Sequence, residues 1–384
     1  MNKKALLISC YHEWYENRLK PIKEYLIGIG YDVEIILSDF EHINKTYISN
    51  PNPECNYIHV PRYNTNISIQ RIWSHICFGK QVSFLLKKLQ PDLIYQVLPP
   101  NNTACYCAKY KKQHPECKYI VDVIDLWPES LPLSCLRKTF PAKIWADFRN
   151  ESLKLANHVF LECGLYKEKL KDVVPNLKEK SSVLYLFKKQ TTKERELVLK
   201  TIEEYEIIKA KFPNKIRMAY LGSINNIIDV DGICDVVKNF LNNGQEVEVR
   251  IIGEGQSRNS FLKALESSGA EVNYYGKIFD ENEKIKILGI CDFGLNMMKD
   301  NIIVGLTIKS IDYFSMGLPI INNIKGDTWD LVHNNDLGLN INSTNKKQKQ
   351  IIFNKRIIFD FFEKNFSKSS FIKNVKKLLT GSIV

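Results

Sequence analysis

Short apolar runs alternate with longer amphipathic stretches along the first half of the chain. In the amphipathic stretches, such as 69–89 and 142–156, apolar residues recur at helical spacing. This alternation is typical of βαβ units, in which the strands form a parallel sheet and helices cover it. The strands predicted in this half are 4–9, 32–37, 93–97, 119–124, 158–162 and 182–187.

The second half of the chain repeats the pattern. A highly charged segment, 188–215, separates the halves and indicates a linker followed by an exposed helix. We therefore expect two doubly wound α/β domains, 1–188 and 189–384, the second including the linker and a terminal helix that can cross back. Ligands of such sheets bind at the carboxyl ends of the strands, where the strand order reverses. The strands predicted in this half are 216–221, 247–252, 272–275, 293–297, 319–321 and 339–341.

Length and composition agree with two folded domains. A chain of 384 residues is too long for one core, and 44% hydrophobic with 25% charged residues is ordinary for a globular protein. No apolar run approaches the roughly 18 residues of a membrane span. The N-terminal apolar run lacks a cleavage site of small residues, so we interpret it as a buried strand and not as a signal peptide.

The cysteines indicate the cellular compartment, and the net charge indicates which classes of partner the protein can bind. Ten cysteines are scattered without a C-x-x-C pair, which favours reduced thiols in a cytoplasmic protein. The seven histidines show no metal-binding spacing, so no metal site is predicted. The net charge of +11 suits nucleic acid, anionic lipid or a phosphate-bearing substrate, and it does not choose among them.

Two loops of the second half carry candidate chemistry. In the first, Gly253 and Gly255 follow a predicted strand and would let the backbone approach a ligand, although a tight turn explains them equally well. The third glycine of a dinucleotide fingerprint is absent, so NAD is not expected. In the second, Thr307 can cap a helix whose first turn, with Lys309, suits a diphosphate. Asp312 would project nearby, although an ordinary capped helix remains an alternative.

The order of motifs in the second half resembles the donor domain of GT-B glycosyltransferases of the retaining family 4. The segment 309–319 is similar to that family's K-x-x-E-Y-x-x-x-G-x-P signature. In the first half, D-L-W-P-E-S at 125–130 resembles the D-x-W-P-E-S segment of a bacterial subgroup that builds surface polysaccharides. The other matching landmarks are Y-L-G-S at 220–223, V-R-I-I-G-E-G at 249–255, V-N-Y-Y-G-K at 272–277 and C-D-F-G-L at 291–295.

This resemblance implies a fold and an activity. The fold would be GT-B, with two Rossmann-like doubly wound domains facing across a cleft. The chain would move a sugar from a nucleotide sugar to a saccharide acceptor, with retention of configuration, in capsular, exopolysaccharide or O-antigen synthesis. The acceptor would be lipid-linked, no cofactor or metal would be needed, and nucleic acid would not be a partner.

The resemblance also implies residue roles. Asp125 and Glu129 would be the catalytic-side carboxylates facing the acceptor, and no protein nucleophile is expected. Other acceptor-side residues would be His12, Glu13, Arg18 and Trp127, although Trp127 in the core is an alternative. The implied donor-binding residues are Gly222, Ser223, Asn225, Asn226, Gly253, Glu254, Gly255, Gly276, Lys277, Gly305, Leu306, Thr307, Lys309 and Asp312.

The sequence departs from the family pattern in three places. The first acid of the family's E-x7-E pair falls on Val304, and the second falls on Asp312. The turn at Gly222 is not followed by the usual arginine and lysine, and Y-H-E-W at 11–14 replaces a double-glycine loop. Two alternatives therefore stay open: a nucleotide-sugar epimerase on the same fold, or a non-catalytic binding or scaffold subunit of a polysaccharide assembly.

A basic and aromatic stretch, 62–88, predicts contact with an anionic membrane surface. An ordinary amphipathic helix with its aromatic side chains in the core is the alternative. With a lipid-linked acceptor, we expect a cytoplasmic protein that is peripheral on the cytoplasmic face of the membrane. The residues of this stretch on which the prediction rests are Arg71, Trp73, Phe78, Lys80, Phe84, Lys87 and Lys88.

Overall fold

The computed structural model describes residues 3–131, 139–342 and 353–383. The chain forms two compact units: Met1–Leu186 with Phe371–Val384, and Phe187–Ser370. The chain thus passes from one unit to the other twice; the sequence analysis placed the domain boundary at 188 and allowed the terminal helix to cross back. No helix in the described part of the chain is long and apolar enough to cross a membrane.

The first unit is built on a seven-stranded parallel sheet in the order β5-β2-β1-β6-β7-β8-β9. The six strands predicted in this half are present, and a short edge strand, β5, was not predicted. A separate antiparallel hairpin, β3–β4, was also missed. The strands are β1 (Lys3–Ile8), β2 (Tyr31–Ser38), β3 (Phe40–Glu41), β4 (Thr46–Tyr47), β5 (Asn56–Ile58), β6 (Leu93–Leu98), β7 (Lys118–Val123), β8 (His158–Leu161) and β9 (Ser181–Val183).

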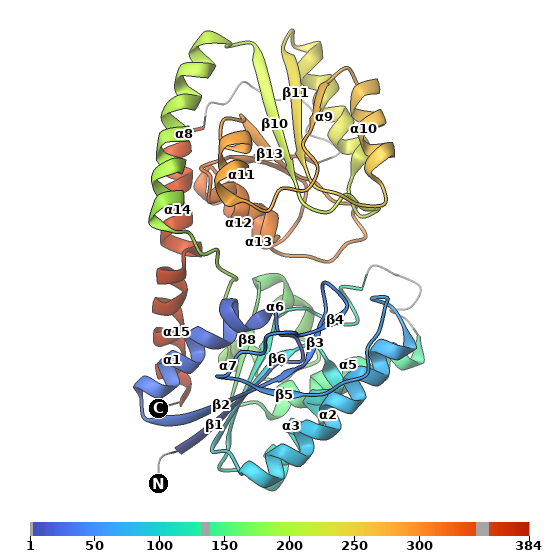
Figure 1. The fold of residues 1–384 in the computed structure, drawn as a ribbon, viewed down its shortest axis with the longest axis vertical. Coiled ribbons are helices and arrows are strands. Elements are labelled where there is room, and N and C mark those ends of the chain that lie inside the picture. Colours follow the sequence, from blue (N-terminus) through green and yellow to red (C-terminus); the bar gives the residue numbers. More distant parts are fainter. Residues whose placement is uncertain (1–2, 132–138, 343–352, 384) are drawn as a thin grey trace. The chain divides into compact units, whose positions relative to one another are not determined.

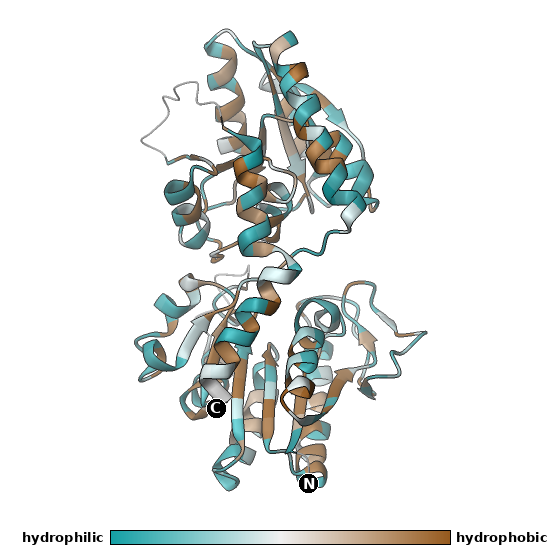
Figure 2. Cartoon of the chain, turned by 90° about the vertical axis from the view of Figure 1, so that its left-hand side faces the viewer, coloured by the Kyte–Doolittle hydropathy of each residue, from teal (hydrophilic) through white to brown (hydrophobic). Residues whose placement is uncertain are grey.

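Amphipathic helices cover this sheet. In α2, the Ser68 hydroxyl caps the helix by accepting a hydrogen bond from the Arg71 N–H at 3.2 Å, and Phe78, Val82 and Leu86 are buried. Figure 2 shows apolar residues along the strands and mixed polarity along the helices. The helices are η1 (Tyr15–Leu19, a π-helix), α1 (Lys20–Gly28), α2 (Ile69–Leu89), α3 (Asn101–Gln113), α5 (Phe140–Leu155), α6 (Gly164–Leu170), α7 (Leu177–Lys180) and α15 (Lys368–Ile383).

The second unit is built on a six-stranded parallel sheet in the order β12-β11-β10-β13-β14-β15. All six predicted strands are present: β10 (Lys215–Leu221), β11 (Glu246–Ile252), β12 (Glu271–Tyr274), β13 (Phe293–Asn296), β14 (Ile320–Asn322) and β15 (Gly338–Asn340). The helices are α8 (Thr192–Lys211), α9 (Val230–Asn242), α10 (Arg258–Ser267), α11 (Glu281–Leu288), α12 (Ile308–Phe314), α13 (Asp327–Asn335) and α14 (Lys355–Phe366).

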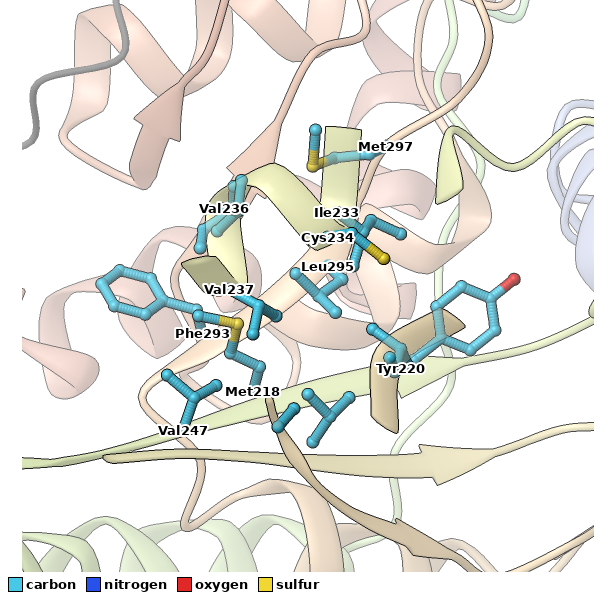
Figure 3. Packing of buried hydrophobic residues seen from close by; sticks show 14 of the residues in the cluster. Met218, Tyr220, Ile233, Cys234, Val236, Val237, Val247, Phe293, Leu295 and Met297 are labelled. Atoms are coloured by element: carbon cyan, nitrogen blue, oxygen red, sulfur yellow. The ribbon is translucent and has the colours of Figure 1, made fainter. Parts of the chain in front are cut away.

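The core of the second unit lies between this sheet and its helices. Met218 of β10, Val247 of β11 and Phe293 of β13 pack against Val236 and Val237 of α9 (Figure 3). The side chain of Asp229 fixes the start of α9 by accepting a hydrogen bond from the Gly232 N–H at 3.0 Å. This packing holds the central strands in register and so sets the positions of the loops at their carboxyl ends.

Strand order reverses at the same place in both units. The reversal lies between β1 and β6 in the first unit and between β10 and β13 in the second. In each case the connecting loops leave the carboxyl ends of the two strands in opposite directions. Each unit is therefore a Rossmann-like domain with an expected binding site at this point.

A buried ion pair fixes the middle of the first unit. Arg18 is fully buried and binds Asp122 through two hydrogen bonds, of 2.6 and 2.7 Å. Tyr95 donates to the same carboxylate at 2.6 Å, and the Arg18 guanidinium lies 5.4 Å from the ring centroid of Phe371 in α15. This arginine therefore links η1, β7 and the terminal helix.

Replacing Arg18 should destabilise the first unit strongly. Arg18→Ala leaves Asp122 buried without its cation, and breaking such a pair costs about 3–5 kcal/mol. Chemical denaturation should show the difference in unfolding free energy. Arg356→Ala is the matched control, because the Arg356–Asp360 pair is half exposed on both sides and should change stability by less than about 1 kcal/mol. Equal losses in the two variants would contradict the argument.

Candidate functional site

The loop after β10 forms the centre of the candidate donor site. Gly222 has a φ of +113°, which L side chains rarely adopt. A Cβ at this position would lie 2.9 Å from Cε of Lys309, so the lysine side chain passes directly over the glycine. The Lys309 amino group donates to the Tyr220 hydroxyl at 2.8 Å and lies 4.2 Å from the centroid of that ring.

Burial tunes the charge of Lys309. It lowers the pKa of the amino group to about 8, and the nearby Asp312 carboxylate opposes this shift without cancelling it. Burial also raises the pKa of Tyr220, so the phenol stays neutral. Lys309 is therefore a cation near neutral pH that gains from an additional negative charge.

The two glycines after β11 serve the packing of the loops. A Cβ on Gly253 would lie 2.0 Å from the Gly222 carbonyl oxygen, and one on Gly255 would lie 2.1 Å from that of Ile224. Hydrogen bonds join the same loops, from Gly222 N–H to Ile252 and from Ile224 N–H to Glu254, each of 2.9 Å. The glycines therefore bring two loop backbones together, as the tight-turn alternative requires.

The start of α12 is fixed by a buried polar network. Thr307 caps the helix by accepting from the Ser310 N–H at 3.1 Å and donates to Asn296 at 2.9 Å. Thr328 donates twice to the Gly305 carbonyl, from its N–H and its hydroxyl, each at 2.8 Å. Gly305, Leu306 and Thr307 are buried, whereas Val304 is half-buried. This network holds the first turn of α12, from which Lys309 projects.

Asp312 has an ion-pair partner that sequence reasoning missed. The Lys188 amino group lies 2.7 Å from Asp312 and 2.8 Å from Glu281, at the start of α11. Burial lowers the pKa of Lys188, but the two carboxylates outweigh burial and the net shift is upward. Lys188 lies in the segment predicted as a linker, and no local sequence signal marks a contact with residues so distant in the chain.

The remaining donor-side residues differ in exposure. Ser223, Asn226 and Lys277 are exposed, and the Asn225 side chain accepts from the Ile227 N–H at 3.2 Å. Glu254 accepts from the Tyr274 hydroxyl at 2.8 Å and pairs with Arg258 at 3.2 Å. The Gly276 carbonyl accepts from the Gly253 N–H at 2.8 Å.

In the first unit, the residues of the D-L-W-P-E-S segment bind one another. Asp125 accepts from the Trp127 indole N–H at 2.6 Å and from the Ser130 hydroxyl, and burial raises the pKa of its carboxyl group. Glu129 forms a bidentate ion pair with the buried Arg149, at 2.6 and 2.8 Å. Both carboxylates remain half-buried, so each stiffens the loop and keeps some exposure.

Two predicted acceptor-side residues need correction. Arg18 is fully buried in its ion pair with Asp122, so it cannot contact an acceptor in this structure. Trp127, expected as an exposed aromatic wall, is 7% exposed and belongs to the core. His12 and Glu13 stay half-buried; His12 contacts the Tyr57 hydroxyl at 3.3 Å, and Glu13 accepts from the Ile43 N–H at 3.0 Å.

The basic and aromatic stretch forms the N-terminal approach to α2 and the helix itself. Trp73 is 53% exposed and Phe84 is 63% exposed, and Lys80, Lys87 and Lys88 lie at the surface. Phe78 and Arg71 were included in the predicted membrane face, but both are buried. The helix thus combines a core face with an outer face that carries aromatic and basic side chains.

A metal site was not found within the described ranges, where no group of three or more His, Cys, Asp or Glu residues is placed to hold an ion. Closely spaced carboxylates can bind a divalent cation, and the second unit contains one D-x-D sequence, Asp229–Val230–Asp231. Asp229 caps α9 and accepts from Asn323 at 2.9 Å, which gives it a structural role.

Solved structures resemble this chain over nearly its full length. Sucrose-phosphate synthase from Thermosynechococcus elongatus is 12% identical, with 99% of this chain and 98% of that one covered and a TM-score of 0.66. Anabaena HepE, solved with UDP and glucose, is 11% identical, with coverage of 100% and 99% and a TM-score of 0.58. The chain has the GT-B fold.

A third neighbour of this GT-B chain is the lipopolysaccharide outer core galactosyltransferase WaaB. It is 16% identical, 99% of each chain is covered, and the TM-score is 0.59. No protein-family model matches the sequence, and no curated protein matches it either. At these identities the likeness establishes the fold, and the activity has to be argued from the residues.

Lys309 predicts how nucleotide binding to the second unit depends on pH. Because the lysine is charged below a pKa of about 8, affinity for UDP should fall as pH rises from 7 through 9. The terminal phosphate of UDP, with a pKa near ~6, is already ionised there. Lys309→Arg should flatten the profile, and Lys309→Met should weaken binding by about tenfold at pH 7. Calorimetry measures the affinity for UDP at each pH. If Lys309→Arg shows the same dependence on pH as the wild type, Lys309 does not contact the nucleotide.

Proposed function

We propose that this chain is a glycosyltransferase that moves a sugar from a nucleotide-sugar donor to a saccharide acceptor. The observation that carries the proposal is the placement of Lys309 over Gly222, at the strand-order reversal of the second unit. A cation beside a glycine turn suits a diphosphate, because the backbone can approach closely and the charge is offset. The GT-B fold supports the same activity.

The donor would be held by three groups of the second unit. Lys309 and the first turn of α12 would bind the diphosphate and stabilise it as it leaves. Because α12 has only seven residues, the lysine would contribute more than the helix dipole. The Asp312 oxygen that is not bonded to Lys188 would accept hydrogen bonds from the nucleotide ribose.

The reaction would retain configuration at the transferred sugar carbon, without a protein nucleophile. A donor phosphate oxygen would take the acceptor proton in a front-face attack. Asp125, Glu129, His12 and Glu13 would lie on the acceptor side, the first two through a loop that their hydrogen bonds and ion pair stiffen. Asp125→Asn should therefore affect acceptor use and leave UDP binding to the second unit unchanged.

The transfer assay separates this proposal from the alternatives. A panel of labelled sugar nucleotides is screened for binding, and the cognate donor is incubated with and without saccharide acceptors. Acceptor-dependent product with the donor's anomeric configuration is expected. A change in the sugar without acceptor would instead indicate an epimerase, and binding without any transfer would indicate the scaffold subunit.

Transfer should not depend on a metal ion. The proposed diphosphate contacts are Lys309 and backbone groups, so excess chelator should leave the rate within about twofold, well below the ~1.4 kcal/mol of a tenfold effect. The rate is measured with and without EDTA, and then with added Mg²⁺ or Mn²⁺. Complete loss that either ion restores would contradict this design and direct attention to Asp229 and Asp231.

We also propose that the acceptor is lipid-linked and that the first unit meets the cytoplasmic face of the membrane. The support is the outer face of α2, where Trp73 and Phe84 are more than half exposed beside surface lysines. Aromatic and basic side chains on one helix suit an anionic interface. Each surface lysine near such a membrane contributes about 1 kcal/mol, so three suffice for reversible binding.

Vesicle sedimentation tests this surface. The protein should pellet with phosphatidylglycerol-containing vesicles at low salt, and less with neutral vesicles or at high salt. Replacing Lys80, Lys87 and Lys88 with Glu should release it, while UDP binding persists as a check of folding. A protein that ignores anionic vesicles at every salt concentration would favour an acceptor in solution.

A further inference from the structure

Two cationic side chains of the first unit converge outside the site described above. The Arg71 guanidinium donates to the Asn66 carbonyl at 2.6 Å, and the Lys45 amino group donates to the Asn66 side-chain oxygen at 2.6 Å. Both cations also lie over the Tyr63 ring, 5.7 and 5.0 Å from its centroid. Two positive charges are thus held on the same pair of residues, where they repel each other.

Arg71 is enclosed by aromatic side chains. It is 6% exposed, its guanidinium carbon lies 4.4 Å from a ring centroid of Trp127, and it donates to the Tyr11 hydroxyl at 2.8 Å. Its Nε is buried and has no hydrogen-bond partner among the described residues. A buried donor without a partner is costly, so this atom requires an explanation.

Arg71 differs in its partners from the other buried arginines of the first unit. Arg18 binds Asp122 and Arg149 binds Glu129, each through a bidentate ion pair. In the ranges that the structure describes, neither Arg71 nor Lys45 forms an ion pair with a carboxylate, and the residues outside those ranges include no Asp or Glu. Removing a charge from water without a counter-ion costs several kcal/mol. The pattern indicates that the counter-ion comes from a ligand.

The neighbouring carboxylates form no ion pair with either cation in the ranges that the structure describes. One oxygen of Glu13 accepts from the Ile43 N–H, and the other is buried without a hydrogen-bond partner in the described chain. Asp125 is bound to Trp127 and Ser130. Glu13 and Asp125 thus lie near the cations without forming an ion pair with them.

The histidines beside the cations are neutral. Burial, followed by the charges of Arg71 and Lys45, lowers the pKa of His42 to about 3. Burial and Arg71 likewise hold the pKa of His75 well below its ordinary value. His75 contacts the Tyr11 hydroxyl at 3.1 Å through Nε2, and its buried Nδ1 has no partner among the described residues. The positive charge of the cluster therefore resides on Arg71 and Lys45.

Backbone geometry at Lys45 supports a functional role. Lys45 has a φ of +59°, a left-handed conformation that is uncommon for residues other than glycine, asparagine and aspartate. The lysine lies in the loop of the β3–β4 hairpin, where a glycine would be the relaxed choice. Strain of this kind is kept where the surrounding structure requires that side chain in that place.

We propose that Arg71 and Lys45 form a receptor for an oxyanion, a carboxylate or a phosphate, carried by the saccharide acceptor. The inference rests on the proposed function, which places the acceptor on the first unit. A guanidinium and an ammonium directed at one group are suited to an oxyanion, which accepts several charge-assisted hydrogen bonds. The cluster includes Tyr11, just beyond β1, and Trp127, just beyond β7, so it lies at the carboxyl edge where such sheets bind ligands.

Binding measurements with defined probes test the receptor. D-glucuronate supplies a carboxylate, D-glucose 6-phosphate supplies a phosphate, and D-glucose is the neutral control, all at constant ionic strength and without donor. We expect at least one anionic sugar to bind about tenfold or more tightly than glucose, the gain of one charge-assisted hydrogen bond. The ratio of the dissociation constants of the two anionic sugars shows whether the receptor prefers a carboxylate or a phosphate.

Variants assign the binding to these residues. Lys45→Met should abolish the preference for the anionic sugar, and Arg71→Lys should reduce it. Lys20→Met is the matched control, since Lys20 is another half-exposed lysine near a tyrosine ring but has Glu16 as its partner. Because Arg71 is buried, its variant is compared with the wild type by circular dichroism, and Lys45→Met carries the test if Arg71→Lys unfolds.

The outcomes separate this inference from the proposed function. Wild-type protein that binds UDP and transfers sugar, but shows no preference for anionic sugars, would overturn the receptor and leave the activity intact. A preference that survives in Lys45→Met or disappears in Lys20→Met would also overturn it. Anion binding lost only in the Lys45 and Arg71 variants supports the receptor, even if the wild type transfers no sugar and the proposed function fails.

Discussion

Parallel pairing brings the carboxyl ends of all strands in each main sheet to one edge, and the reversal of strand order separates the loops that follow the central pair. The central candidate groups of both units follow from this constraint. In the second unit, Gly222 begins the loop after β10, and Lys309 projects from α12, the helix beyond β13. In the first unit, Tyr11 and Trp127 follow β1 and β7. The sheets thus decide which residues can meet, although those residues lie far apart in the sequence.

Charge that is buried without full compensation marks both candidate sites. Arg18 and Arg149 each have a carboxylate, so they contribute to the fold and are unavailable to ligands. The partners of the Lys309 amino group are the hydroxyl and the ring face of Tyr220, and burial lowers the pKa of this lysine to about 8. Within the part of the chain that the structure describes, Arg71 has backbone, hydroxyl and ring contacts only. The distinction between structural and functional cations therefore rests on their partners, because all four are wholly or largely buried.

The sequence predicted twelve strands of the two main sheets and the two-domain fold, because a strand buried in a parallel sheet is a short apolar run, which is a local property of the sequence. The hairpin β3–β4 and the edge strand β5 were missed, since their residues, F-E, T-Y and N-Y-I, form no apolar run. Arg18 and Trp127 were assigned to a surface because a motif specifies neighbours in sequence and not depth in the fold. The ion pairs of Lys188 and the role proposed for Arg71 could not be predicted, since they depend on Asp312, Glu281 and Tyr63, which only the tertiary structure brings to them.

Val304 stands where the resembled family has the first acid of its E-x7-E pair. The resemblance calls for two carboxylates, one of them at that position, and of these the chain has Asp312, which shares its lysine partner with Glu281 of α11. Glu281 and Asp312 share the Lys188 amino group, which limits the repulsion between them and leaves an oxygen of Asp312 for a hydroxyl group. Lys188 is the second residue of the second unit, and its N–H donates to the Phe366 carbonyl at 2.9 Å, close to where the chain leaves that unit. Through Lys188, the Asp312 carboxylate is therefore connected both to the start of α11 and to the end of α14.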